Sequence, residues 1–152
     1  MIKVTNLTHY YNKDLALENI NLEIKSGEFI AIIGESGSGK STLLSVLSTL
    51  LKPTSGDIIY ENTNYKDIKN IDDFRKNNIG FIFQFHYLIN YLSVKENINL
   101  ANEKASKEEI FNLLKLLGIE NLIDKYPNEI SGGQRQRVAI ARALINNPKI
   151  IF

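Results

Sequence analysis

The nine residues Gly34-Glu35-Ser36-Gly37-Ser38-Gly39-Lys40-Ser41-Thr42 stand between an apolar run and a series of leucines. The apolar run, residues 29–33, is short and uninterrupted, which predicts a strand buried on both faces of a parallel sheet. The leucines recur at helical spacing, at positions 43, 44, 47, 50 and 51. The nine residues therefore form a strand-to-helix turn, which is the context that the pattern G-x-x-x-x-G-K-S/T requires in a phosphate-binding loop.

The residue types of this loop suit a polyphosphate. Gly37 and Gly39 allow backbone N–H groups to turn inward around phosphate oxygens, and the positive end of the following helix points to the same place. Lys40 would reach the β- and γ-phosphates, and the Ser41 hydroxyl would bind Mg²⁺. The predicted binding residues are Gly34, Ser36, Gly37, Ser38, Gly39, Lys40, Ser41 and Thr42.

Two other interpretations of the loop are weaker. The first is a turn rich in glycine and serine that carries a lysine by chance, which the flanking strand and helix patterns disfavour. The second is a dinucleotide-binding turn at Gly37-Ser38-Gly39, but Thr42 stands where a third glycine belongs.

The composition indicates one globular domain. The chain has 152 residues, of which 43% are hydrophobic and 23% charged. A net charge of +1 gives no electrostatic argument for binding to nucleic acid or anionic lipid. The absence of cysteine rules out disulfides and thiolate metal sites. Neither a signal peptide nor an apolar run of about 18 residues is evident, so we expect a cytoplasmic location.

The remaining patterns predict an α/β chain in three parts. The first part, residues 1–84, combines the core with antiparallel β structure, a short helix at 72–77 and a second buried strand, 79–83, which ends at Gln84. A helical subdomain follows at about 85–137, and 138–152 returns to the core. Alternation predicts strands at 2–8 and 20–24, and 57–60 with 62–64 is predicted to form part of an antiparallel hairpin.

The helical part is marked by helix start signals. Ser93 with Glu96, Ser106 with Glu109, and Ser131 with Gln134 each form a predicted capping box. Gly118 is predicted to stop the second of these helices. A new apolar strand begins at 149. Taken alone, Ser131-Gly132-Gly133-Gln134 is explained equally well as a simple helix N-terminus, with Ser131 as its cap, and as a functional motif.

The order of three motifs resembles the ATP-binding-cassette ATPases over essentially the whole chain. The motifs are the Walker A loop at 34–41, Gln84 as the Q-loop and 131–134 as the signature motif. Ile130 replaces the leucine that usually precedes the signature. The amino-acid sequences of residues 79–84 and 134–144 are similar to those of the lipoprotein-releasing and macrolide-export branch of bacterial transporter ATPases. The resemblance implies a P-loop NTPase with a RecA-like parallel sheet core, an antiparallel β subdomain and an inserted α-helical subdomain.

The resemblance also implies roles for single residues. Tyr10 matches the aromatic platform for adenine, although the adjacent Tyr11 could take that role, or Tyr10 could be a half-buried tyrosine at a strand end. Gln84 would sense Mg²⁺ and the attacking water. The segment 85–91 would dock a transmembrane partner, while core packing is the alternative role for its aromatic rings. The catalytic residues implied are Lys40, Gln84 and Ser131, and Ser41 and Gln84 are the implied metal ligands.

In the resembled mechanism two cassettes meet head to tail. Ser131 and Gly133 of one chain then contact the γ-phosphate that the Walker loop of the other holds. The implied partners are a second cassette, in a homodimer, and permease subunits that place the pair on the inner face of the membrane. Two other readings are a soluble ATPase of the same family that acts on ribosomes or DNA, and a nucleotide-binding module that does not hydrolyse ATP.

The sequence departs from this family at its end. The strand that begins at 149 should lead to the Walker B aspartate and the adjacent glutamate, and neither is present in the 152 residues. These carboxylates hold Mg²⁺ and polarise the attacking water in the family. We therefore expect a fragment or truncated product that does not hydrolyse ATP alone, with its C-terminal part missing.

Replacement of Lys40 by Ala tests the phosphate-loop assignment. Lys40 is the only cationic side chain of the nine-residue stretch, so this variant of the intact parent protein should lose nearly all affinity for Mg-ATP. Calorimetric titration measures the affinity directly, and an unchanged value would show that the loop does not bind phosphate.

Overall fold

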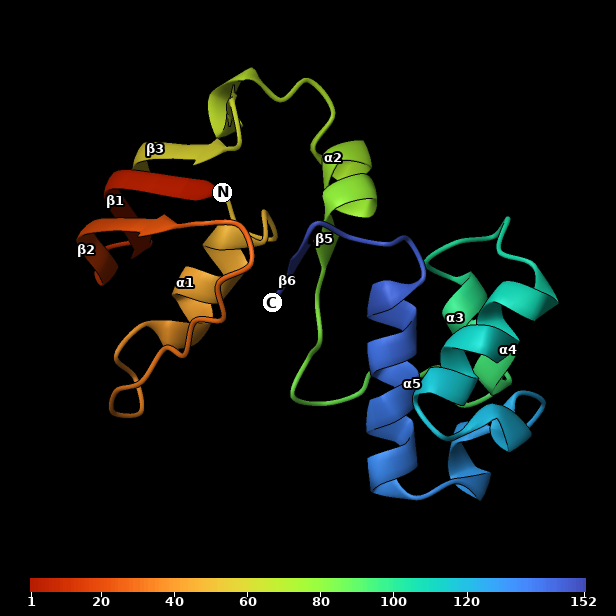
Figure 1. Cartoon of the computed structure of the whole chain (residues 1–152). Helices are drawn as coiled ribbons and strands as arrows, with labels where there is room; N and C mark the ends of the chain where they lie inside the picture. The colour runs from red at the N-terminus through yellow and green to blue at the C-terminus, as the bar shows by residue number, and fades with distance from the viewer. The chain divides into compact units, whose positions relative to one another are not determined.

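The computed structural model describes residues 1–152, and the chain divides into two compact units, Met1–Ile71 and Asp72–Phe152 (Figure 1). The strands are β1 (Ile2–Tyr11), β2 (Asp14–Ile24), β3 (Ser55–Tyr60), β4 (Thr63–Asn64), β5 (Ile79–Gly80) and β6 (Ile150–Ile151). The α-helices are α1 (Lys40–Leu47), α2 (Ile71–Asn78), α3 (Val94–Asn99), α4 (Lys107–Leu116) and α5 (Gly132–Leu144). Three single-turn 3₁₀ helices are η1 (Tyr65–Asp67), η2 (Glu120–Leu122) and η3 (Pro127–Glu129).

The first unit contains a four-stranded antiparallel sheet in the order β2-β1-β3-β4. Apolar residues of β1 point to one face, where Ile2, Val4 and Leu7 are buried. The helix α1 also buries its apolar residues Leu43, Val46 and Leu47. The Tyr60 hydroxyl of β3 donates a 2.7 Å hydrogen bond to the Leu47 carbonyl, so sheet and helix are joined. Burial raises the pKa of this tyrosine.

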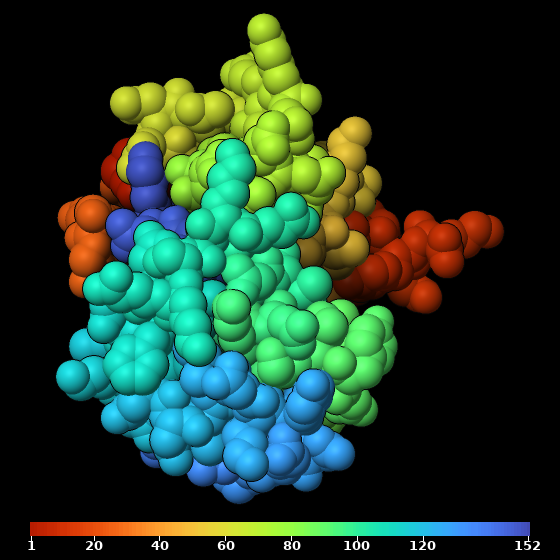
Figure 2. Space-filling view, turned by 90° about the vertical axis from the view of Figure 1, so that its right-hand side faces the viewer, coloured from red at the N-terminus to blue at the C-terminus, as the bar shows by residue number.

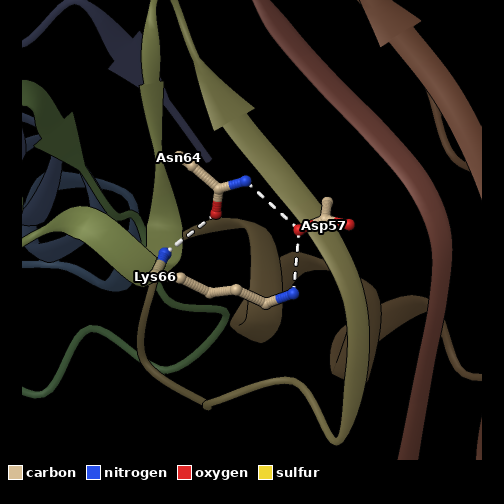
Figure 3. Close-up of polar contacts among 3 residues, drawn as sticks. All are labelled: Asp57, Asn64 and Lys66. Atoms are coloured by element: carbon tan, nitrogen blue, oxygen red, sulfur yellow. Dashed lines mark hydrogen bonds and ion pairs between the residues drawn. The ribbon is translucent and has the colours of Figure 1, made fainter.

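A polar cluster closes the β3–β4 corner (Figure 3). Asp57 accepts hydrogen bonds from the Lys66 ammonium at 2.8 Å and from the Asn64 amide at 3.2 Å. The side-chain amide oxygen of Asn64, Oδ1, accepts from the Lys66 backbone N–H at 3.0 Å. The hydrogen bond from Lys66 holds the pKa of Asp57 below its ordinary value, with Asn64 as the second cause.

The second unit is organised around the packing of α3, α4 and α5. Figure 2 shows the green, cyan and light blue parts of this unit closely packed on the face turned to the viewer. Its buried core consists of Val94, Ile98, Ile110, Leu114, Ile119, Leu122, Ile123, Ile130, Val138 and Ala141. The structure has no helix with both the length and the apolar character needed to cross a membrane.

The three predicted capping boxes are confirmed. In each box the serine oxygen accepts from the backbone N–H three residues later, and the glutamate or glutamine side chain accepts from the serine N–H. The glycine stop is also confirmed, since Gly118 follows α4 with a φ of +67°. These signals involve residues within four positions of each other, so the sequence specifies them locally.

The two predicted buried strands differ from the structure. Residues 29–33 take part in neither sheet, and Phe29 and Ile33 are 96% and 90% exposed. A strand forms only where a neighbour accepts its backbone hydrogen bonds, and this segment has no ladder partner. The second strand is present but shorter than predicted. It pairs parallel to β6 at Ile79 and Gly80. Further backbone hydrogen bonds join the two segments, from the Lys149 N–H to the Asn78 carbonyl at 3.0 Å, from the Phe152 N–H to the Gly80 carbonyl at 2.8 Å and from the Ile82 N–H to the Phe152 carbonyl at 2.8 Å.

Replacement of Asp57 by Asn tests the corner cluster. The folded-state pKa of Asp57 lies below its ordinary value of 3.8, so its contribution to stability is present above the pKa of the unfolded state. That contribution is lost as the pH falls through the folded pKa. Above about pH 5 the variant should therefore unfold at a lower temperature than the parent chain, and the difference should vanish in strong acid.

Thermal unfolding monitored by circular dichroism at several pH values measures this difference. Asp67→Asn is the matched control, because Asp67 lies on the adjacent 3₁₀ turn and forms no ion pair in the structure. A pH-independent difference for Asp57→Asn would contradict the ion-pair explanation.

Candidate functional site

The glycine loop leads directly into α1, whose first residue is Lys40. Gly37 and Gly39 have φ values of +82° and +86°, a left-handed conformation that favours glycine. Gly39 is the N-cap of the helix, and no side chain caps it. The first turn of α1 carries no acidic residue. Its N–H groups and the positive end of its dipole therefore remain available to an anion.

Gly39 also permits a close approach between α1 and the sheet. A Cβ at this position would stand 2.6 Å from the Ala16 carbonyl oxygen and 3.0 Å from the Leu17 side chain, both on β2. A Cβ at Gly37 would meet nothing within 4 Å. Hence Gly39 sets the position of the helix, while Gly37 only shapes the loop.

Lys40 folds over the loop that precedes it. Its ammonium donates to the Glu35 carbonyl and, at 3.3 Å, to the Ser38 hydroxyl. The side chain is half-buried and forms no ion pair. The one cation of the loop is thus held beside the backbone groups that would surround a phosphate, and an anion could replace its two neutral acceptors.

A pocket of about 440 Å³ opens at the N-terminus of α1. This volume is within the usual range of small-molecule sites. The pocket is lined by Tyr11, Asp14, Leu15, Ala16, Ser36, Gly37, Gly39, Lys40, Ser41 and Thr42. Six of the predicted loop residues therefore lie together. The other two, Gly34 and Ser38, do not line it, although a Cβ at Gly34 would stand 2.9 Å from the Ser38 hydroxyl oxygen.

The two neighbouring tyrosines differ in their relation to this pocket. Tyr11 lines it, whereas Tyr10 does not. Both rings are partly exposed, at 46% and 42%. The Tyr10 backbone N–H donates to the Thr54 hydroxyl at 3.1 Å. Sequence reasoning missed the β2 wall of the pocket, residues 14–16, which becomes visible only once Tyr11 is paired with Asp14 across the β1–β2 turn.

The signature residues lie in the second unit, at the start of α5. The Ser131 oxygen accepts from the Gln134 N–H at 3.3 Å, and the Ser131 N–H donates to the Gln134 side chain at 2.8 Å. Ser131, Gly132 and Gly133 are all exposed. A Cβ at either glycine would meet nothing within 4 Å. This helix N-terminus is therefore open to a ligand or a partner.

Gln84 begins an exposed segment of the second unit. Its side chain is exposed, and so are the rings of Phe85, Tyr87 and Tyr91, at 66%, 63% and 80%. The rings of Phe83 and Tyr87 meet edge to face, with centroids 5.3 Å apart. The high exposure argues against core packing as the role of the three rings.

The side chains of Arg142 and Asn97 hold the backbone of the segment after Gln84 through hydrogen bonds. The Arg142 guanidinium of α5 donates to the carbonyl oxygens of His86 and Tyr87, at 2.7 and 2.8 Å. Burial lowers the pKa of Arg142. The Asn97 side chain of α3 is fully buried and bonds to both backbone groups of Ile89. The aromatic rings are consequently carried by an ordered backbone.

The comparisons with known proteins agree with this arrangement. The sequence profile of the ABC transporter family matches residues 17–152. The chain belongs to the ABC transporter family. It is 45% identical over 164 aligned positions to the lipoprotein-releasing system ATP-binding protein LolD of Wigglesworthia glossinidia brevipalpis. This alignment covers 100% of this chain and 72% of that protein. The chain is 43% identical to the bacitracin export ATP-binding protein BceA of Halalkalibacterium halodurans, of which 65% is covered.

Solved ABC structures confirm the predicted fold class. The dimeric bacterial ABC transporter cassette MJ0796 superposes with a TM-score of 0.88 at 42% identity, over 99% of this chain and 72% of that one. A dimer of the same cassette in a post-hydrolysis state with ADP and Pi gives the same TM-score at 41% identity. The predicted likeness to ABC transporter ATPases, including the lipoprotein-releasing branch, is thus confirmed. No group of three or more acidic, histidine or cysteine side chains suited to a metal ion is present.

Substitutions of Gly37 and Gly39 test the close approach of α1 to β2. Gly37→Ala should cost about 1–2 kcal/mol, because alanine must adopt a left-handed conformation. Gly39→Ala should cost about 1–3 kcal/mol more, since its Cβ also meets the Ala16 carbonyl. Urea unfolding of both variants gives the difference, and equal losses would contradict the close approach.

Proposed function

We propose that this chain is the ATP-binding subunit of a bacterial-type ABC transporter. In this proposal Mg-ATP binding and hydrolysis by a head-to-tail dimer move transmembrane partners. The observation that carries the proposal is the pocket at the N-terminus of α1, where Lys40, Ser41 and Thr42 meet a partly exposed tyrosine. A triphosphate, a metal ion and a base would each find a matching group there.

The residues of the pocket suit the parts of Mg-ATP. The phosphates lie against the α1 N-terminus and the glycine loop, with Lys40 at the β- and γ-phosphates. Ser41 supplies a hydroxyl ligand to Mg²⁺, which would neutralise phosphate charge and bring a water molecule into reach. Tyr11 stacks on adenine, since it lines the pocket and Tyr10 does not. Ser36 and Thr42 complete the wall of hydroxyl groups.

The second unit would contact nucleotide through the exposed N-terminus of α5 and through Gln84. Ser131 and Gly133 would contact the γ-phosphate bound by a second copy, because an exposed helix N-terminus is a suitable anion site and the Ser131 cap occupies only the Gln134 N–H. The exposed Gln84 would contact Mg²⁺ and the attacking water. The two dimeric structures of the similar cassette support the pairing.

The segment after Gln84 would contact the permease. Phe85, Tyr87 and Tyr91 present apolar surface on a backbone that Arg142 and Asn97 fix. Exposed aromatic rings on an ordered backbone are typical of protein interfaces. The proposed place of the assembled protein is accordingly the inner face of the membrane, where the cassette itself remains in the cytoplasm.

Complementation between two inactive variants tests the dimer. Ser131→Arg should leave ATP binding by a single chain intact and abolish hydrolysis by the full-length pair, because the arginine blocks the nucleotide of the other chain. Lys40→Ala should abolish hydrolysis through its own site. An equal mixture of the two should recover at most about a quarter of the parent activity, because half of randomly formed dimers are mixed and each has one intact site.

Ser106→Arg is the matched control. Ser106 caps α4 with the same hydrogen bonds that Ser131 makes at α5, but the resemblance gives it no role at the nucleotide. This variant should retain hydrolysis. Loss of ATP binding by a single Ser131→Arg chain, or a mixture with no recovered phosphate release, would contradict a role of Ser131 in trans.

A further inference from the structure

His9 is a buried histidine on β1 without a hydrogen-bond partner. Its side chain is 7% exposed, and neither ring nitrogen meets a donor or acceptor in the structure. A buried polar group of this kind is uncommon, because its transfer from water is uncompensated. The imidazole is therefore held by packing and not by polar bonds.

The aromatic neighbour of His9 is Tyr11. The two ring centroids lie 4.9 Å apart with an interplanar angle of 85°, which is an edge-to-face contact. Such a contact is favourable because the positive edge of one ring meets the negative face of the other. Tyr11 is otherwise 46% exposed and lines the pocket at α1. One flank of its ring is thus fixed while the rest faces the pocket.

The strand partner of His9 connects this contact to the phosphate loop. His9 pairs with Leu17 of β2, and the Leu17 side chain would stand 3.0 Å from a Cβ at Gly39. Two residues paired across β1 and β2 therefore lie next to the two parts of the pocket: His9 contacts the Tyr11 ring, and Leu17 lies close to Gly39 of the glycine loop.

We propose that His9 is a positioning residue that fixes the Tyr11 ring for stacking on the base of the nucleotide. An exposed tyrosine can occupy several rotamers, and stacking requires one of them. The contact with His9 favours one orientation before the ligand arrives, so less conformational entropy is lost on binding. This inference rests on the proposed ATP site and adds a residue that does not itself touch the ligand.

The test compares ATP with inorganic tripolyphosphate, each with Mg²⁺, by calorimetric titration of the full-length protein. Tripolyphosphate has the phosphates and lacks the base, so it reports on the loop alone. His9→Leu should weaken ATP binding about three- to tenfold, which corresponds to the usual free energy of an aromatic pair contact. It should leave tripolyphosphate binding unchanged. His9→Phe retains a ring without buried nitrogens and should bind ATP within about twofold of the parent.

Val4→Ala is the control for general loss of stability. Val4 is buried on β1 like His9, but it is paired with Leu22 and Ile58 and lies away from the pocket lining. This variant should lower the unfolding temperature and leave the ratio of the two affinities unchanged. A change in that ratio for Val4→Ala would overturn the positioning role, because the ratio would then report stability.

A double-mutant cycle completes the test. In a Tyr11→Ala background, His9→Leu should have no further effect on ATP affinity, because His9 acts only through that ring. Equal losses for ATP and tripolyphosphate, or an undiminished effect without Tyr11, would overturn the inference. A parent protein that binds neither ligand would overturn the ATP site itself, which is a different result from binding that ignores position 9.

Discussion

The contact between Gly39 and the Ala16 carbonyl is the constraint on which the phosphate-loop pocket depends. Only the absence of a side chain at this position lets the first turn of α1 lie against β2. From that contact follow the direction of the helix dipole, the position of Lys40 and the β2 wall of the pocket. The phosphate-binding motif therefore also determines packing, because Gly39 allows α1 to lie against β2.

Local chemistry was the part of the structure that the sequence predicted best. Each of the three predicted capping boxes is formed by a serine and a residue three positions later, so its hydrogen bonds depend on no distant segment. The β3–β4 hairpin was predicted for the same reason. Residues 29–33 were not predicted correctly, because an apolar run becomes a strand only through hydrogen bonds to distant partners that the run itself cannot specify.

The site shows the same limit at finer scale. The glycine loop was found from its spacing, but the aromatic wall depends on register. The pairing of β1 with β2 shifts between Leu7 and His9 and again between His9 and Tyr10. These irregularities break the simple alternation of faces along the strand, so counting residues cannot decide whether Tyr10 or Tyr11 faces the pocket. The side chains of 14–16 were missed because they enter from the neighbouring strand.

The helix α5 has one further consequence. Its first turn presents Ser131 and the exposed glycines, and Arg142, ten residues after the helix begins, holds the backbone of His86 and Tyr87. At a rise of about 1.5 Å per residue, the two points are separated by about 15 Å of continuous helix. A helix of this length bends little, so a displacement of its first turn is accompanied by a displacement of the end that carries Arg142. The chain thus contains a mechanical linkage made of a single secondary-structure element and two arginine hydrogen bonds.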